Sequence, residues 1–141
     1  MPVRSAEATW QGTFKEGAGN IKLESGAYDG PFNFTSRFED GNATNPEELL
    51  AGAHAGCYTM ALNLHLIKDG FTPTRVHTVA EVTLEKGESG FSISHIHLIT
   101  EAEVPNISAE AFAAHAEDTK NSCIVSRALS AVPMSLEAKL V

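Results

Sequence analysis

The sequence predicts an α+β domain, with strands toward both ends and one long helix between them. Three observations favour this class. Apolar and polar residues alternate near the N-terminus, as in a strand with one buried face. A long apolar segment between Asn45 and Gly70 carries helix-boundary residues at both ends. Residues 76–84 and 91–104 alternate again around a glycine-rich turn. We therefore expect one α+β domain over residues 1–141.

The N-terminal third predicts two strands and a weaker third. Apolar and polar residues alternate over residues 8–14, and the alternation resumes at Ile21 and Leu23. Between them, residues 17–20 have the composition of a turn. Residues 32–38 are the third candidate strand, on thinner evidence.

The central helix has boundary signals at both ends. Asn45 is a suitable N-cap, Pro46 fits the first turn, and Glu48 lies three residues after the cap. Asp69 and Gly70 supply the stop. Apolar residues cover most of the helix circumference, so we expect burial on more than one side. The main apolar stripe comprises Leu49, Leu50, Ala53, Cys57, Met60, Ala61, Leu64 and Ile67.

The C-terminal half predicts a hairpin, a second helix and a closing strand. Residues 87–90 form the hairpin turn, and Ser108 is the expected N-cap of the second helix. Residues 121–122 interrupt that helix, and Cys123 stands at the start of a short new helical turn. Residues 133–141 alternate once more, which indicates the closing strand.

Charge and composition exclude several classes of protein. The formal net charge is -8, with 10 Lys and Arg against 18 Asp and Glu, so no basic surface is available for nucleic-acid phosphates. Hydrophobic residues make up 43% of the chain, but no apolar run is long enough to span a bilayer. The first ten residues carry charges and lack an apolar signal core. We therefore expect a cytoplasmic protein with no nucleic-acid or membrane partner.

The two cysteines are the first candidates for chemistry. Cys57 lies in the central helix among small residues that leave room for a substrate, although a cysteine at such a position is more commonly part of a core. Cys123 lies at the start of a short helix, where a thiolate is stabilised. Two distant thiols can meet in a fold, react with a peroxide and close into a disulfide. Two structural cysteines are the alternative.

Arg37 and Glu47 are further candidates. A guanidinium stabilises a thiolate and polarises an O–O bond, and a carboxylate can orient it. The alternatives are a solvated strand end for Arg37 and a charge that complements the helix dipole for Glu47. Glu47 and Cys57 are ten residues apart on one helix, about 15 Å of rise, and cannot touch within it. If both serve one site, two antiparallel helices from two subunits are the direct solution.

Three histidines give weaker signals. His95 and His97 fall on one face of a strand, a spacing that can hold a metal. The sequence places no further ligand nearby, so surface or half-buried histidines are the better interpretation. His54 lies one turn before Cys57 and either contacts the site or packs in a helix interface.

Three segments carry a family resemblance. Residues 45–57, NPEELLAGAHAGC, resemble the core motif of the OsmC family (osmotically inducible protein C) and its Ohr relatives (organic hydroperoxide resistance protein). Residues 35–39 resemble the family's arginine segment, and residues 122–126 resemble its second cysteine segment. Order, spacing and length agree over essentially the whole chain. His54 is more similar to the OsmC branch, whereas Ile124 replaces a proline often found after the second cysteine.

The resemblance implies an intertwined homodimer, in which antiparallel sheets wrap around long central helices, and a cysteine-based peroxidase of stress defence that reduces organic hydroperoxides. It assigns Cys57 as the peroxidatic thiolate, which becomes a sulfenic acid, and Cys123 as the resolving thiol of a Cys57–Cys123 disulfide. Arg37 would stabilise thiolate and peroxide, and Glu47 would orient Arg37. The resemblance implies an external dithiol reductant and no metal or organic cofactor.

Other functions stay open on the sequence alone. One is a dimeric stress-induced binding protein whose thiols are incidental. Another is a metal site built from Cys57, Cys123 and a histidine. A thiol hydrolase is the third, although no acyl-oxyanion motif is evident.

Overall fold

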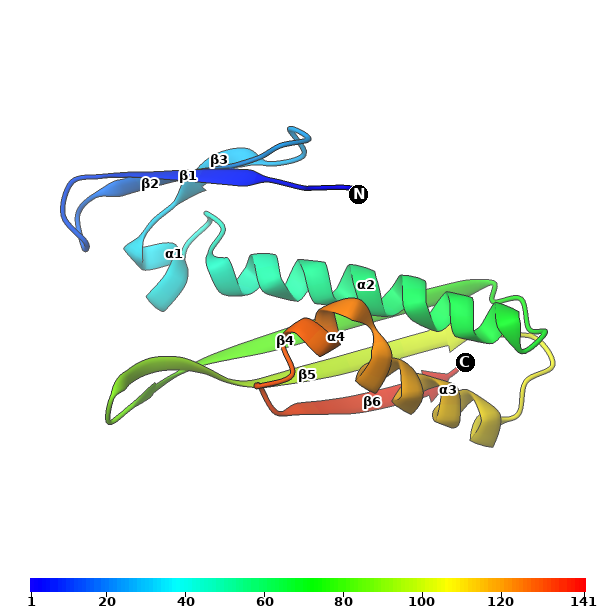
Figure 1. The fold of residues 1–141 in the computed structure, drawn as a ribbon. Coiled ribbons are helices and arrows are strands. Elements are labelled where there is room, and N and C mark those ends of the chain that lie inside the picture. The colour runs from blue at the N-terminus through cyan, green and yellow to red at the C-terminus, as the bar shows by residue number, and fades with distance from the viewer. The chain divides into compact units, whose positions relative to one another are not determined.

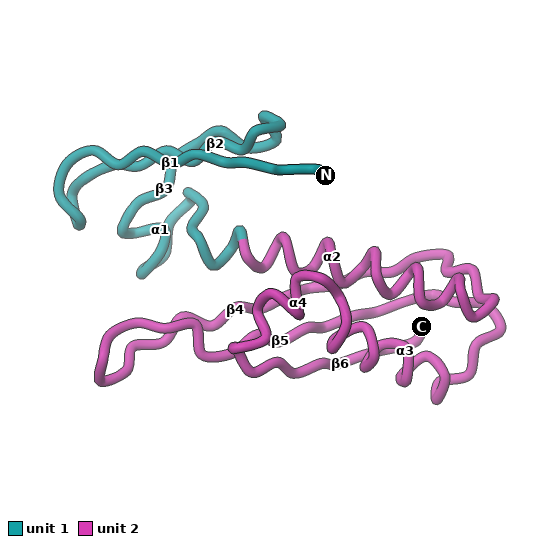
Figure 2. Tube along the Cα trace, viewed as in Figure 1, with its two compact units in different colours: residues 1–49 teal, residues 50–141 magenta.

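The computed structural model describes all 141 residues, and the chain divides into two compact units, residues 1–49 and 50–141 (Figure 2). Helix α2 (Pro46–Lys68) begins in the first unit and continues in the second. Each unit has a three-stranded sheet together with helical segments. This confirms the predicted α+β class, while the expectation of one domain stays a prediction.

The first unit contains an antiparallel sheet in the order β1-β2-β3. Its strands are β1 (Ala6–Gln11), β2 (Ala18–Leu23) and β3 (Asp29–Phe32). Residues 18–20, expected in a turn, pair with β1 instead. The connection starts at Gly12, whose φ of +92° is readily adopted only by glycine.

Residues 34–38 form helix α1 (Phe34–Phe38), which corrects the expectation that 32–38 is a strand. The cause is a capping box. The Asn33 side chain accepts from the Ser36 backbone N–H at 2.7 Å, and the Ser36 hydroxyl accepts from the Asn33 N–H at 2.9 Å. Phe34 and Phe38 are one helical turn apart, and their ring centroids lie 5.0 Å from each other.

The second unit contains a sheet in the order β4-β5-β6 with helices beside it (Figure 1). β4 and β5 form an antiparallel hairpin, whereas β6 pairs with β5 in parallel through a helical crossover. The hairpin, the second helix and the closing strand are confirmed, but residues 121–122, expected to interrupt that helix, are its last residues, and the break lies at Cys123. The bounds are β4 (Arg75–Gly87), β5 (Gly90–Glu103), α3 (Ala109–Ser122), α4 (Ile124–Ala128) and β6 (Met134–Leu140).

Helix α2 begins and ends where the sequence predicts. The Asn45 side chain accepts a hydrogen bond from the Glu48 N–H at 2.7 Å, as an N-cap does. Beyond the last turn, Gly70 adopts a φ of +88°, the left-handed conformation that ends many helices. None of the helices has the length and apolar character required to cross a membrane.

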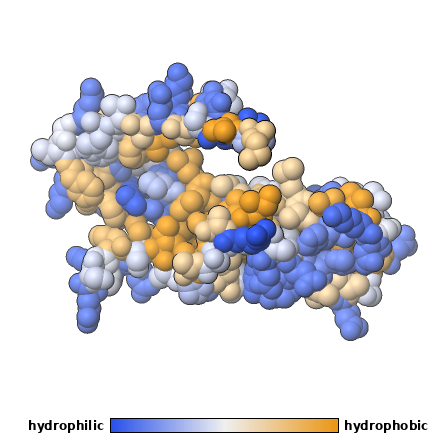
Figure 3. Space-filling view, in the orientation of Figure 1, coloured by the Kyte–Doolittle hydropathy of each residue, from blue (hydrophilic) through white to orange (hydrophobic).

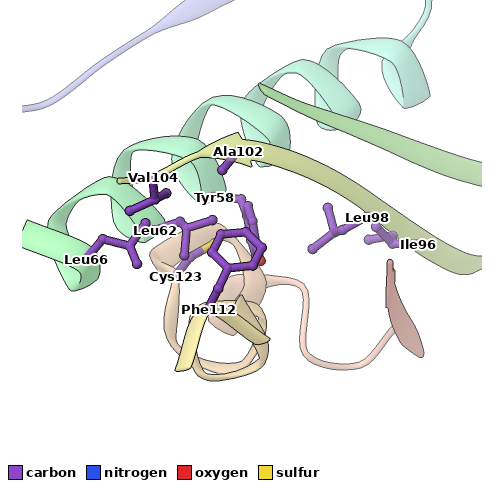
Figure 4. Close-up of a cluster of buried hydrophobic side chains, with 9 residues drawn as sticks. All are labelled: Tyr58, Leu62, Leu66, Ile96, Leu98, Ala102, Val104, Phe112 and Cys123. Atoms are coloured by element: carbon purple, nitrogen blue, oxygen red, sulfur yellow. The ribbon is translucent and has the colours of Figure 1, made fainter. Parts of the chain in front are cut away.

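The core of the second unit lies between its helices and one face of the sheet (Figure 4). The residues that β5 contributes to it are even-numbered and therefore share one face of the strand. His95 and His97, which are odd-numbered, lie on the opposite face. The buried cluster comprises Tyr58, Leu62, Leu66, Ile96, Leu98, Ala102, Val104, Phe112 and Cys123.

Helix α2 buries a different stripe from the one expected. Met60, Leu64 and Ile67 were assigned to the main apolar stripe, but they are 76%, 49% and 50% exposed. Figure 3 shows apolar surface along α2. The helix is apolar on more than one side, and the second unit covers only one of them. The residues of α2 that are fully buried recur every four positions and are His54, Tyr58, Leu62 and Leu66.

Candidate active site

Cys57 stands in the middle of α2 and is a free, half-buried cysteine. It packs against the buried cluster from its edge. On α2 its neighbour Gly56 is exposed, and a Cβ added there would meet no other atom within 4 Å. Cys57 therefore combines contact with the core and access to solvent, as a reacting thiol requires.

Cys123 is the second free cysteine and is only 2% exposed. It lies where α3 ends and α4 begins, and it caps both helices. Its backbone N–H donates to the Thr119 carbonyl at 2.9 Å, and its sulfur accepts from the Ser126 N–H at 3.3 Å. Figure 4 shows Cys123 beside Phe112 and Leu62 within the core.

The surroundings of Cys123 favour its protonated thiol. Burial is the largest cause and raises the pKa of Cys123, while the two hydrogen bonds with Ser126 act in the opposite direction. The interaction with the Cys57 side chain raises this pKa further. The helix start was expected to stabilise a thiolate at this position. The hydrogen bond to the sulfur is present, but desolvation outweighs it.

The two thiols lie near each other in the second unit. Cys57 packs against the buried cluster that contains Cys123, and it contributes to the raised pKa of Cys123. One thiol is accessible and the other is buried, and both are reduced. The sequence separates them by more than sixty residues, and the fold brings them together through α2 and the α3–α4 junction.

His54 is fully buried and faces Ser126 on α4. His54 Nε2 lies 2.7 Å from Ser126 Oγ, and the Cys123 thiol donates to the same Oγ at 3.2 Å. Burial lowers the pKa of His54, so its neutral imidazole is favoured. Of the two roles considered for His54, contact with the cysteine site is therefore the one found within the chain.

Arg37 and Glu47 form a two-point ion pair in the first unit. Arg37 Nε lies 3.0 Å from Glu47 Oε1, and Arg37 Nη2 lies 3.1 Å from Glu47 Oε2. The Glu47 side chain is 9% exposed and that of Arg37 is 39% exposed. The carboxylate thus holds the plane of a guanidinium that still reaches solvent.

His95 and His97 are engaged in hydrogen bonds between β5 and β6. Each ring has a nitrogen within hydrogen-bond distance of the Ser135 hydroxyl, and His97 Nε2 also lies 3.1 Å from Glu137 Oε2. The structure contains no group of three or more His, Cys, Asp or Glu side chains that could hold a metal ion. The two histidines are half-buried and hydrogen-bonded between β5 and β6.

Comparison with known proteins decides the family. A model of the OsmC family, described as OsmC-like protein, matches residues 39–137. This chain belongs to the OsmC family. Peroxiredoxin OsmC from Escherichia coli (strain K12) is 43% identical to it over 129 residues, which cover 91% of this chain and 90% of that protein. The resemblance seen in the sequence is thereby confirmed.

Solved structures agree on the OsmC fold. The organic hydroperoxide resistance protein OhrB of Bacillus subtilis has a TM-score of 0.68 at 22% identity, covering 97% of this chain and 98% of that one. The OsmC-like protein from Mycoplasma pneumoniae has a TM-score of 0.76 at 14% identity, covering 99% and 98%. At such identities the similarity establishes a shared fold.

Sequence reasoning missed one residue of this OsmC-family site. Ser126 contacts both His54 and Cys123, yet it was not among the candidates. A signal was available, because Ser126 lies three residues after Cys123 and this spacing places it at the third position of a helix that Cys123 caps. The contact with His54, 72 positions away in the chain, depends on the fold.

Proposed function

We propose that this protein reduces organic hydroperoxides to alcohols in stress defence, with Cys57 as the peroxidatic thiol and Cys123 as the resolving thiol. Membership of the OsmC family and 43% identity to a peroxiredoxin support the peroxidase activity. One observation supports the assignment of residues. The two cysteines are reduced and neighbouring, and Cys57 is half-buried whereas Cys123 is buried.

The cycle has three steps. The Cys57 thiolate attacks the terminal oxygen of the hydroperoxide, the O–O bond breaks, and the alkoxide leaves as the alcohol after it takes a proton. Cys57 is now a sulfenic acid. Cys123 attacks its sulfur, forms the disulfide and releases water. An external dithiol then reduces the disulfide and regenerates both thiols.

Arg37 and Glu47 support the first step. The guanidinium of Arg37 stabilises the thiolate and the charge that develops as the O–O bond breaks. Glu47 fixes the plane of that guanidinium through the two hydrogen bonds of 3.0 and 3.1 Å. A residual exposure of 39% leaves the Arg37 side chain able to meet a substrate.

A second subunit supplies this pair. Glu47 lies in the first turn of α2 and Cys57 ten residues later, which corresponds to about 15 Å along a helix. Cys57 therefore meets Arg37 and Glu47 of the partner in a homodimer. The exposed apolar residues Met60, Leu64 and Ile67 on α2 supply surface for such an association. The cytoplasmic location expected from the sequence stays a prediction.

The test is peroxide turnover together with the state of the thiols. We would measure consumption of cumene hydroperoxide with a dithiol reductant for the wild type, Cys57→Ser and Cys123→Ser. The proposal expects no turnover with Cys57→Ser, and a Cys57 sulfenic or overoxidised acid in Cys123→Ser when reductant is withheld. Equal rates in all three proteins would favour a binding protein with incidental thiols. Metal in the purified protein that is lost with Cys57→Ser would favour the metal-site alternative.

A further inference from the structure

A continuous chain of hydrogen bonds connects a buried histidine to the resolving thiol. His54 Nε2 lies 2.7 Å from Ser126 Oγ, and the Cys123 sulfur lies 3.2 Å from the same Oγ. The Ser126 backbone N–H also donates to the Cys123 sulfur at 3.3 Å. All three side chains are buried, with exposures of 0%, 4% and 2% for His54, Ser126 and Cys123.

The geometry fits one arrangement of the hydrogens in particular. A serine hydroxyl carries one hydrogen, and Ser126 accepts from the Cys123 thiol. In the tautomer of His54 that carries its hydrogen on Nδ1, the Ser126 hydroxyl donates to His54 Nε2. When the thiol loses its proton, the same three groups can reverse, so that His54 donates to Ser126 and Ser126 donates to the thiolate. The chain thus has two states that differ by one transferred proton.

The other ring nitrogen of His54 argues against a purely structural role. His54 Nδ1 is buried and has no hydrogen-bond partner. A buried polar atom without a partner costs free energy, and such atoms call for an explanation. The side chain of His54 makes its one hydrogen bond to Ser126, which in turn contacts the Cys123 thiol. A role in proton transfer explains why an imidazole with an unpaired nitrogen is kept at this buried position.

The resolving step creates a need for a proton acceptor. Cys123 must give up its proton as it attacks the Cys57 sulfenic acid. Burial raises the pKa of Cys123 and keeps the thiol protonated in the resting protein. Burial also lowers the pKa of His54, so its imidazole is neutral and has a lone pair for the proton, but it is a weaker base than a free histidine. The transfer is therefore coupled to S–S bond formation, in which the Cys123 sulfur gives up the electrons that held its proton.

We propose that Ser126 and His54 form a proton relay for disulfide formation, an inference that rests on the peroxidase cycle proposed above. Ser126 is a catalytic residue because it contacts the reacting sulfur, and His54 is a positioning residue that acts through it. As the Cys123 sulfur forms the S–S bond, its proton moves to Ser126 Oγ while the Ser126 hydrogen moves to His54 Nε2. The S–O bond of Cys57 breaks, and the departing hydroxide takes a proton from solvent to give water.

The relayed proton has a route to solvent. Ser126 lines an open pocket of about 480 Å³, so His54 can release its proton through Ser126 once the disulfide has formed. Lys120 and Arg127 line the same pocket, and Lys120 pairs with Glu117 at 2.7 Å.

The ionisable groups near the relay come from three helices. From α2 they are Cys57 and Tyr58, from α3 Lys120 and Glu117, which acts on Tyr58, and from α4 Arg127. The residues that β5 buries beside the helices, Ile96, Leu98, Thr100 and Ala102, are not ionisable. The Tyr58 hydroxyl donates to the Ala116 carbonyl, and burial raises its pKa beyond the range of the experiment. A titration seen in the resolving step therefore has few possible origins.

A single-turnover experiment separates the relay from the peroxidase reaction itself. Reduced protein is mixed with one equivalent of cumene hydroperoxide, and the sulfenic acid and the disulfide are followed by mass spectrometry between pH 5.5 and 9. The variants are His54→Gln, Ser126→Ala and Ser126→Thr. His65→Gln is the matched control. His65 lies on the same helix and contacts the buried hydroxyl of Thr119 at 2.9 Å, but this hydrogen bond does not lead to a thiol.

The relay predicts an effect on the second step alone. In His54→Gln and Ser126→Ala the sulfenic acid forms at the wild-type rate, disulfide formation slows about 10- to 100-fold near pH 7, and the rate recovers only at higher pH. Ser126→Thr restores the rate and His65→Gln keeps it. If disulfide formation in Ser126→Ala kept the wild-type rate and pH profile, the relay would be overturned. This outcome decides the question even if His54→Gln does not fold. A wild type that forms no sulfenic acid would instead overturn the peroxidase proposal.

Discussion

The Arg37 guanidinium meets the Glu47 carboxylate along two parallel hydrogen bonds, with Nε–Oε1 at 3.0 Å and Nη2–Oε2 at 3.1 Å. Such a fork fixes both the position and the plane of the cation. The capping of α1 by Asn33 and of α2 by Asn45 places the two partners on successive helices of the first unit. The local sequence therefore sets the geometry of this ion pair.

Glu47→Gln should reduce peroxidase activity by about 100-fold in kcat/KM, the order found when one stabilising donor of a transition state is lost. The amide removes the charge and directs an NH2 group at the guanidinium, so Arg37 loses its orientation. The measurement is steady-state turnover of cumene hydroperoxide. Glu101→Gln is the control, because Glu101 pairs with Arg75 at 2.6 Å on an exposed part of the sheet. Equal activity in the two variants would remove Glu47 from the site.

Mixing two inactive variants should restore activity if the site is shared between subunits. Arg37→Ala chains keep Cys57, and Cys57→Ser chains keep Arg37 and Glu47. In a heterodimer one of the two sites is then complete, so a mixture allowed to exchange subunits should reach roughly a quarter of wild-type activity. The control is each variant incubated alone. A mixture as inactive as its components would place the whole site within one chain.

Met60→Glu should weaken the homodimer. Met60 is 76% exposed on the apolar side of α2 that the chain leaves uncovered, and a carboxylate buried in an interface without a partner is costly. Analytical ultracentrifugation should show a monomer, or a dimer that dissociates at least tenfold more readily, with an estimated cost above about 1.4 kcal/mol. Phe91→Glu is the control and should leave the dimer intact. Phe91 is a 54% exposed aromatic residue in the β4–β5 hairpin. If Phe91→Glu weakened the dimer more than Met60→Glu, the interface would lie at the hairpin and not on α2.

Much of the fold follows from local sequence signals. Asn45 and Ser108 cap helices as expected, and the alternation in β4 and β5 matches their pairing. The third N-terminal strand was expected over residues 32–38, but it lies at Asp29–Phe32, and a capping box at Asn33 makes the following residues helical. The stripe of α2 was assigned to the wrong side, because a helix that is apolar all round does not indicate which side its own sheet covers.

The site could be predicted in its parts and not in its connections. The sequence predicted four candidate site residues, namely Cys57, Cys123, Arg37 and Glu47. The structure shows the pairing of Arg37 with Glu47. Their catalytic roles stay predictions. The hydrogen bond from Ser126 to His54 joins residues 72 positions apart, and no periodicity or spacing indicates such a contact.

Tyr58→Phe should lower the free energy of unfolding by about 1 kcal/mol, the typical contribution of one hydrogen bond. The Tyr58 hydroxyl donates to the Ala116 carbonyl at 2.8 Å, and the side chain is fully buried. Urea unfolding at one fixed protein concentration measures the change. Tyr28→Phe is the matched control, since the Tyr28 hydroxyl donates to Pro31 at the same 2.8 Å where solvent can replace it. A larger loss in the control would contradict the role of burial.

The stability of the protein should depend on pH through His54. Burial holds the pKa of His54 below its ordinary value of 6.5, so between these two values the unfolded chain binds more protons than the folded one. The contribution of His54 is fully present above pH 6.5 and is lost as the pH falls through 6.5 toward the lowered value, with a slope of at most about 1.4 kcal/mol per pH unit.

The His54→Gln variant isolates this contribution, because glutamine does not titrate. Urea unfolding between pH 7.5 and pH 5 should show the wild type losing stability relative to His54→Gln as the pH falls. His77→Gln, at an exposed position of β4, should run parallel to the wild type over the same range. If the wild-type and His54→Gln curves stay parallel instead, the imidazole binds protons equally in the folded and unfolded chain, and burial does not control its charge.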